Sequence, residues 1–238
     1  MSSRASACRP AGSFARVALM IGMCPIVGCA SLPSAWTPFP DQQKLAREQA
    51  KYGTTADQRM ASMATEAKAA KGGTSQQQAE FTARLAARVL EEHDPRVRAR
   101  IVETAAGFDT PAAVSICRGG LEDPEPRVRM SALGAWAKRG GPEALQLLSA
   151  RYQADRDLDV RLRALRELGN LGDGAAIPVL ARALEDPDPA VQYRAVAALK
   201  KVSGRDLGDD VNKWRAWAAD PGDASESWSI AEAFRKLF

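Results

Sequence analysis

DPEPRVRMSAL, residues 123–133, is one of four versions of a single sequence motif, called the phrase below, in this chain of 238 residues. The other versions read EHDPRVRARIV from Glu92, DRDLDVRLRAL from Asp155 and DPDPAVQYRAV from Asp186. When the versions are aligned on their shared valine, successive copies lie 31, 32 and 31 residues apart. The aligned residues are Val97, Val128, Val160 and Val191. A fixed period of this length is typical of solenoids built from stacked repeats.

Each phrase carries the signature of a helix start. An acid stands three positions before each valine, at Asp94, Glu125, Asp157 and Asp188. Proline follows the acid in three copies, and Leu158 takes its place in the other. An aspartate can accept from the free amides of the first turn, and proline has no amide to lose there. Glutamate is a poorer cap, so the helix after Glu125 is expected to fray more at its start.

The apolar pattern predicts helices that pack in pairs. Positions four, five and eight after each valine are apolar in nearly every copy and fall on one helical face with the valine. Upstream of these helices, Thr110-Pro111, Gly141-Pro142 and Gly174 open a second set with its own apolar residues. A helix pair of this size cannot bury its apolar face alone, so neighbouring pairs must stack. The sequence therefore predicts an all-α fold, a short α-solenoid.

The run VRLRALRELGNLGDGAAIPVLARALEDPDPAVQYRAVAALKKV, residues 160–202, resembles HEAT-like repeats of the type named after phycobilisome lyases. The resemblance covers roughly residues 76–202. It implies stacked helix pairs, but it is nearly silent about function, because such solenoids serve scaffolding, binding and a few unrelated enzymes. A lyase-like enzyme, or an enzyme partner that binds a small molecule, is the alternative that the resemblance leaves open.

The first 28 residues have the layout of a secretory signal, with arginines followed by an apolar run from Val17 and then small residues. The end of this run, Ile26-Val27-Gly28-Cys29, resembles the lipobox of bacterial lipoproteins. The resemblance implies that the chain is cut before Cys29, that Cys29 is acylated, and that several acyl chains anchor the protein at the cell envelope. By the same resemblance, Ala30 in place of an aspartate favours the outer membrane over the inner one.

This interpretation divides the chain into four parts. They are a signal peptide (1–28), a tether (29–54), the repeat solenoid with its N-terminal helices (55–202) and C-terminal capping helices (203–238). The last part ends in SWSIAEAFRKLF, with Trp228, Ile230, Phe234 and Leu237 along an amphipathic segment. That segment suits a cap on the last repeat, a docking motif for a partner or a helix at a membrane surface.

Charge and residue types argue against several functions. The formal net charge of +4 falls to +1 once the signal and its three arginines are removed, which gives no electrostatic case for nucleic acid as partner. His93 is the only histidine, so neither a two-histidine metal site nor a Ser/His/Asp set can be assembled from one chain. We therefore expect no catalytic residues, no metal and no cofactor. Cys117 is expected to be a small buried hydrophobe rather than a nucleophile.

Two sets of residues stand out beside the core. The first is a structural ladder of arginines directly after the valines and acids five positions before them: Arg98, Arg129, Arg161, Asp123, Asp155 and Asp186. The second occupies positions two, three and six after the valine and predicts a groove with apolar centres and a basic rim. Its residues are Met130, Leu162, Arg163, Arg166, Tyr193 and Arg194.

A groove of that composition suits a protein or an acidic peptide segment. Scattered apolar side chains among solvated arginines would look the same in the sequence. The favoured hypothesis is a lipid-anchored, non-catalytic binding or scaffolding module. A structural envelope component with no discrete ligand is a further possibility.

Overall fold

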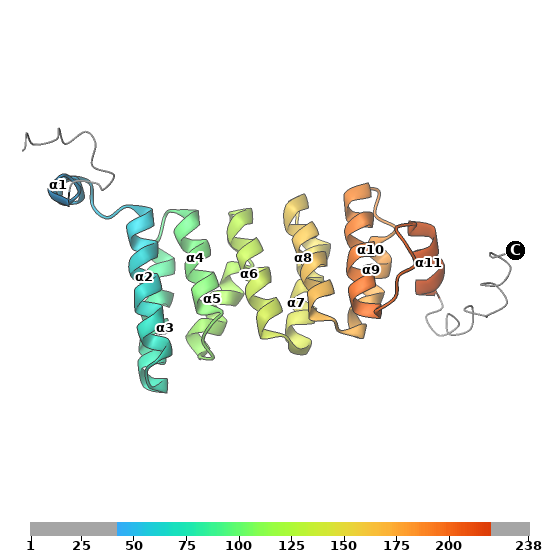
Figure 1. Cartoon of the computed structure of the whole chain (residues 1–238), viewed down its shortest axis with the longest axis horizontal. Helices are drawn as coiled ribbons and strands as arrows, with labels where there is room; N and C mark the ends of the chain where they lie inside the picture. Colours follow the sequence, from blue (N-terminus) through green and yellow to red (C-terminus); the bar gives the residue numbers. More distant parts are fainter. Residues whose placement is uncertain (1–41, 220–238) are drawn as a thin grey trace, which may run out of the picture. The chain divides into compact units, whose positions relative to one another are not determined.

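The computed structural model describes residues 42–219, and every regular element in that range is a helix. Figure 1 shows the order of the helices along the chain. They are α1 (Gln42–Tyr52), α2 (Ala56–Lys71), α3 (Ser75–Glu91), α4 (Pro95–Ala105), α5 (Pro111–Gly120), α6 (Pro126–Arg139), α7 (Gly141–Ala154), α8 (Leu158–Leu171), the 3-10 turn η2 (Gly174–Ala176), α9 (Ile177–Ala183), α10 (Pro189–Ser203) and α11 (Val211–Ala219). The all-α class predicted from the sequence is confirmed.

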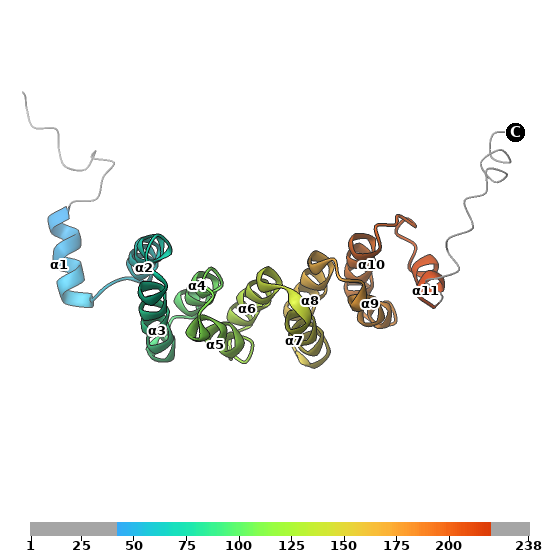
Figure 2. The ribbon, with the colours of Figure 1, turned by 90° about the horizontal axis from the view of Figure 1, so that it is seen from below.

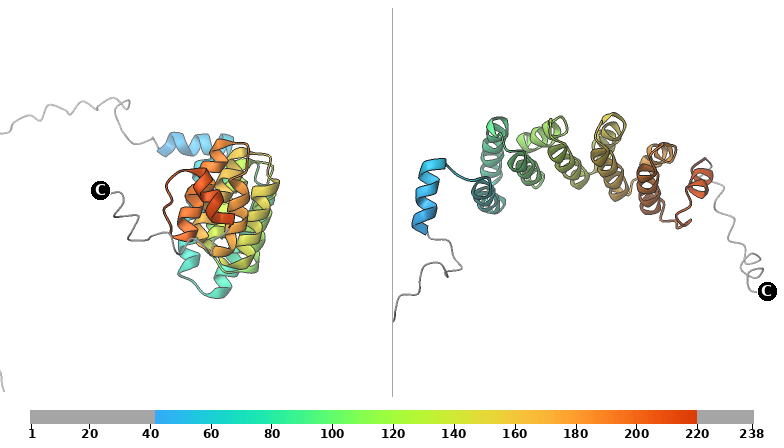
Figure 3. Two further views of the ribbon diagram at one scale, coloured as in Figure 1. Left: turned by 90° about the vertical axis from the view of Figure 1, so that its right-hand side faces the viewer. Right: turned by 90° about the horizontal axis from the view of Figure 1, so that it is seen from above.

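The repeats belong to the second of two units of the chain, Glu48–Phe238. Within it, α4, α6, α8 and α10 follow one another in one layer, and α5, α7 and α9 form the other (Figures 2 and 3). Neighbours in the first layer pack directly on each other, α4 on α6, α6 on α8 and α8 on α10. Each of these four helices, α4, α6, α8 and α10, begins at one copy of the repeated phrase. We call them the inner helices.

The inner helices start where the phrase predicts. The carboxylates of Asp94, Asp157 and Asp188 accept from backbone amides of the first turn at 2.8, 3.1 and 2.8 Å. Glu125 caps α6 without a side-chain hydrogen bond, and Leu158 begins α8 where the other inner helices have proline. Asp94 also binds Arg96, and this hydrogen bond lowers the pKa of the Asp94 carboxyl to about 2.

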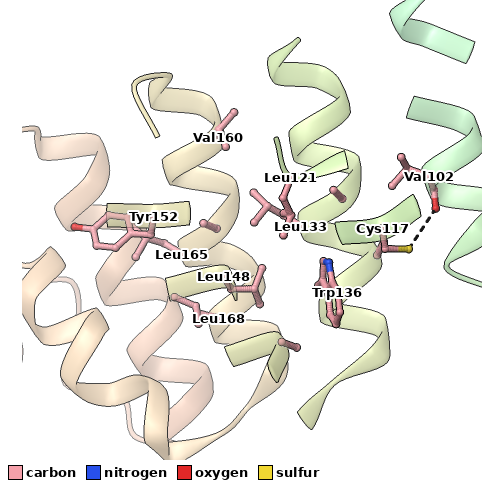
Figure 4. Close-up of a cluster of buried hydrophobic side chains, with 14 of the residues drawn as sticks. Val102, Cys117, Leu121, Leu133, Trp136, Leu148, Tyr152, Val160, Leu165 and Leu168 are labelled. Atoms are coloured by element: carbon pink, nitrogen blue, oxygen red, sulfur yellow. Dashed lines mark hydrogen bonds between the residues drawn. The ribbon is translucent and has the colours of Figure 1, made fainter. Parts of the chain in front are cut away.

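The valines of the phrase lie in one continuous core. All four are at most 1% exposed, and Leu133, Leu148, Leu165 and Leu168 interleave between the two layers (Figure 4). At Gly169 a Cβ atom would lie 2.8 Å from the Cα of Ala198, so α8 approaches α10 closely because this residue has no side chain. Cross-repeat packing of this kind makes each helix pair depend on its neighbours.

Cys117 is part of this core, as predicted. Its thiol donates weakly to the Val102 carbonyl over 4.0 Å (Figure 4), and burial raises its pKa to about 11. The thiol therefore stays protonated, which suits a packing residue and not a nucleophile.

At the C-terminal end of the described range, α11 packs on α9 and α10. Its two tryptophans, Trp214 and Trp217, are buried with their rings edge to face at 5.5 Å, and the Trp214 indole donates to the Gly208 carbonyl. The expected signal peptide, Cys29, the first half of the tether (29–41) and the SWSIAEAFRKLF segment lie outside residues 42–219. None of the helices in that range is both long and apolar enough to cross a bilayer.

Candidate interaction surface

The arginines of the phrase and the acids of the following turns form a ladder along the stack. Arg98 donates through Nε and Nη2 to the two carboxylate oxygens of Asp123, both at 2.8 Å, and Arg129 does the same with Asp155 at 2.8 Å. Arg161 reaches Asp186 at 3.2 Å through Nη1. Each pair joins one inner helix to the turn that leads into the next inner helix.

In the first two pairs, both partners have further contacts that fix the turn. Arg98 and Arg129 also donate to two carbonyls each in the turns before their own helices. The acids Asp123 and Asp155 accept from the backbone amide two residues ahead. Burial raises the pKa of Asp123 and of Asp155, but the arginine and backbone hydrogen bonds outweigh it, so both pKa values are lowered. With these bonding positions taken, the ladder suits structure and not ligand binding.

Sequence reasoning missed the first rung. Arg59 in the first turn of α2 forms a bidentate pair with Glu92, donating through Nε and Nη2 to the two carboxylate oxygens at 3.0 and 3.1 Å. Thr55 caps α2 as the acids cap the inner helices, so α2 begins a repeat of the same kind. Because α3 has 17 residues, this first repeat is longer than the others, and the spacing of 31 or 32 residues between the aligned valines does not reveal it. At the other end Gln192 replaces the arginine and donates to the Asp186 carbonyl at 2.7 Å.

The expected row of exposed apolar side chains at position two differs from what the structure shows. Met130 and Leu162 are half-buried and pack against the core, and only Tyr193, 62% exposed, stands free. The reason is that inner helices contact neighbours on both sides, which widens the buried arc beyond one face. At 100° per residue, the positions that point away from both neighbours are three, six and ten after the valine.

A hollow of about 640 Å³ lies on this outward side, over α6 between α4 and α8. Small residues of α6 form its floor, among them Ser131, Gly134 and Ala137. Glu103 of α4 lines one wall, and Arg163 and Arg166 of α8 line the other.

The hollow exists because the α6 copy departs from its neighbours at two outward positions. Position three reads Arg100, Ser131, Arg163 and Arg194 along the stack, and position six reads Glu103, Gly134, Arg166 and Ala197. The α6 copy thus has the smallest pair, flanked by long charged side chains. The Arg163 guanidinium leans over Gly134, where a Cβ atom would meet its Nη2 at 2.9 Å.

A buried carboxylate organises the α8 wall. Glu167 is 5% exposed; its Oε1 lies 2.6 Å from Arg163 Nε and 3.4 Å from Arg166 Nη2, and its Oε2 accepts from the Asn170 amide at 2.9 Å. An ion pair with Arg163 and hydrogen bonds from Arg166 and Asn170 hold this wall in a fixed arrangement, and the two arginines leave net positive charge at its surface. Across the hollow, Glu103 is occupied by Arg100 and by the Ser131 hydroxyl.

Two cations of α6 complete the hollow, one at each end. Arg127 and Lys138 are exposed, line the hollow, and have no acid within ion-pair distance among residues 42–219. With Glu103 and Glu167 both paired, the hollow offers a surplus of positive charge around a small, partly apolar floor.

A family model of HEAT repeats matches residues 82–161 and 151–223, which together cover 142 of the 238 residues. The chain belongs to the HEAT repeat family. The short α-solenoid expected from the phrase is therefore shown, since the matched repeats are the stacked helix pairs α3 to α11. No curated protein matches the sequence.

Three of the six residues predicted for the HEAT-repeat groove line the hollow, namely Met130, Arg163 and Arg166. Leu162, Tyr193 and Arg194 lie outside its lining. The prediction missed Glu103, Arg127, Lys138 and Glu167. A comparison of the copies at positions three and six would have revealed Ser131 and Gly134 on α6. Small side chains at positions where the neighbouring helices carry large ones indicate a hollow.

A second hollow of about 320 Å³ lies over α3 and α5 of the HEAT array, and apolar residues such as Val89 and Ile116 line most of it. Leu90 at its rim is 86% exposed. Its one charged residue, Asp123, is already held by Arg98. Among residues 42–219, no group of three or more potential metal ligands occurs, and His93 is exposed in a turn.

Proposed function

We propose that this HEAT-repeat protein binds an acidic segment of a partner protein in the hollow over α6 and catalyses no reaction. HEAT repeats commonly mediate protein binding or scaffolding. The observation that carries the proposal is the pair of free cations, Arg127 and Lys138, at the two ends of a small-residue floor. The repeated arginines Arg98, Arg129 and Arg161 are instead paired with acids in the ladder.

The acids near the hollow support a role in binding. A general acid or base needs a proton-transferring position open to a substrate. Glu167 is instead surrounded by Arg163, Arg166 and Asn170, and Glu103 holds Arg100 and Ser131. These contacts orient side chains and hold them still, which lowers the entropy lost when a ligand binds.

We further propose that the protein is a lipoprotein displayed at the cell envelope, on the outer membrane. The support is in the sequence: a charged and apolar leader, the lipobox-like Ile26-Val27-Gly28-Cys29, and Ala30 after it. The chain from Cys29 onward carries a net charge of +1, which supports a protein partner rather than nucleic acid.

A photocrosslinking experiment in the native host tests the binding proposal. A benzoylphenylalanine replaces Ala137 in the hollow or, as control, Gln146, an exposed residue of α7 in the other layer. The proposal expects a discrete adduct from position 137 and none from position 146. The paired change Arg127→Ala and Lys138→Ala should remove that adduct.

A control variant that removes two cations outside the hollow distinguishes the effect of the cations in the hollow from the effect of the protein's net charge. Arg182 and Lys213 are exposed and do not line the hollow. Their double alanine variant lowers the net charge equally and should leave the adduct in place. An adduct that survives loss of Arg127 and Lys138, or that disappears equally with either pair, would refute the hollow as the binding site.

The anchoring proposal is tested separately through Cys29→Ser. The wild-type protein should incorporate an alkyne-labelled fatty acid and sediment with membranes, whereas the variant should do neither. Label retained by the Cys29→Ser variant, or no label on the wild type, would disprove lipidation at this residue.

A further inference from the structure

The arrangement of the two free cations defines what kind of acidic segment fits, an inference that rests on the function proposed above. Arg127 and Lys138 lie eleven residues apart on α6. Eleven residues make three helical turns with about 20° left over, so both side chains leave α6 on nearly the same side. At about 1.5 Å per residue their Cα atoms are about 16 Å apart.

Between these cations α6 lines the hollow with small side chains, among them Gly134 and Ser131. The two walls carry charges of opposite sign. Arg163 and Arg166 face the hollow from α8, and the paired Glu103 faces it from α4. A segment that crosses this floor meets guanidinium donors on one side and an acid on the other. Its central residues should therefore be small and uncharged, with backbone carbonyls available to Arg166.

The volume favours an extended chain over a helix. An α-helix with its side chains is about 10 Å across, so a length of 16 Å would occupy about 1,250 Å³. The hollow holds about 640 Å³, roughly half of that. An extended chain rises about 3.3 Å per residue and spans the distance between the cations in about five residues.

We propose that the hollow binds an extended protein segment that carries two carboxylates about five residues apart. One carboxylate pairs with the Arg127 guanidinium and the other with the Lys138 ammonium. Small residues between them pass over Ser131 and Ala137, beside the Arg163 guanidinium that lies over Gly134. Neither acid alone supplies the full affinity, because the second contact forms at a high effective concentration once the first is made.

The test uses the full chain in detergent micelles with 15N-labelled glycine. The probes are short glycine and serine peptides that carry two glutamates separated by two, five or eight positions. The five-position peptide should move the Gly134 amide signal most and bind at least about fivefold more tightly than the others. Arg127→Ala and Lys138→Ala should each reduce its binding to that of a one-glutamate peptide.

A charge swap guards against variants that merely misfold. The peptide whose second acid is replaced by lysine should bind Lys138→Glu better than it binds the wild-type protein. Binding that depends on both cations but not on the spacing would overturn the extended two-acid mode and leave the proposed function standing. Absence of any Gly134 shift, together with no crosslink from position 137, would refute both.

Discussion

Two glycines of the inner helices act in opposite ways at the residue scale. Gly169 faces the neighbouring helix, and its missing side chain brings α8 against Ala198 of α10. Gly134 faces outward, and its missing side chain leaves the floor over which Arg163 lies. The direction of the residue on its helix decides whether a glycine tightens the stack or opens a surface.

Gly169→Ala should lower the free energy of unfolding by about 1–3 kcal/mol, because the added methyl group meets backbone of α10 and one helix must shift. Gly119→Ala is the control: no atom lies within 4 Å of its Cβ position, so the change should be neutral or stabilise by up to about 1 kcal/mol. Urea unfolding of both variants measures the difference. Equal effects would contradict the close approach of α8 and α10.

Asp155→Asn should be strongly destabilising, by about 3 kcal/mol, because it leaves the Arg129 guanidinium partly buried without its acid. The Asp155 side chain is 2% exposed and that of Arg129 is 12% exposed. Asp109→Asn is the control: the Asp109 side chain is fully exposed and meets Arg139 through a single contact at 3.4 Å, and Arg139 keeps its hydrogen bond to the Phe108 carbonyl, so this change should cost far less. Chemical denaturation at neutral pH compares them.

Acid should weaken the array through the same groups. The pKa values of Asp123 and Asp155 are lowered in the folded chain, so below their ordinary pKa of 3.8 the unfolded chain binds more protons than the folded one. Their contribution to stability is complete above the ordinary pKa and is lost as pH falls towards the folded values. Melting temperatures measured from about pH 5 downward should fall less steeply for Asp123→Asn than for the wild type.

At the scale of elements, the inner helices share a start signal but differ in its quality. Glu125 gives α6 no side-chain cap, whereas Asp188 caps α10 at 2.8 Å. A shorter carboxylate at position 125 can reach the first-turn amides. Glu125→Asp should therefore stabilise the protein by about 0.5–1 kcal/mol, and Asp188→Ala should destabilise it by about 1 kcal/mol. Opposite shifts in thermal midpoint check both, and a loss from Glu125→Asp would contradict the cap assignment.

The elements were predictable because their signals are local. Caps such as Asp94 and Thr110 and the apolar spacing after each valine determine single helices and their pairing. The hollow was only partly predictable, because it depends on three helices at once. Met130 was expected to stand exposed, but contact with neighbouring helices half-buries it. Arg127 and Lys138 became recognisable as a pair only when the lining of one hollow included both.

At the scale of the whole repeat array, stability depends on contacts between neighbours, so damage should remain local. Trp214→Ala removes a fully buried ring from α11 and its hydrogen bond to Gly208. Amide exchange should accelerate in α9 and α10, while protection in α4 and α5 stays close to that of the wild type. Uniform acceleration through every helix would show that the array unfolds as one cooperative unit.

The ladder also has a direction. Each arginine reaches forward to an acid that belongs to the following repeat, so a repeat without a successor would keep a stranded guanidinium. Gln192 occupies that place in the last copy and is satisfied by the carbonyl of Asp186 in the turn before its own helix. A neutral amide does not need an acid from the chain that follows. One residue thus works as a terminator: it lets a pattern that could be repeated indefinitely stop after α10 without leaving a buried charge behind.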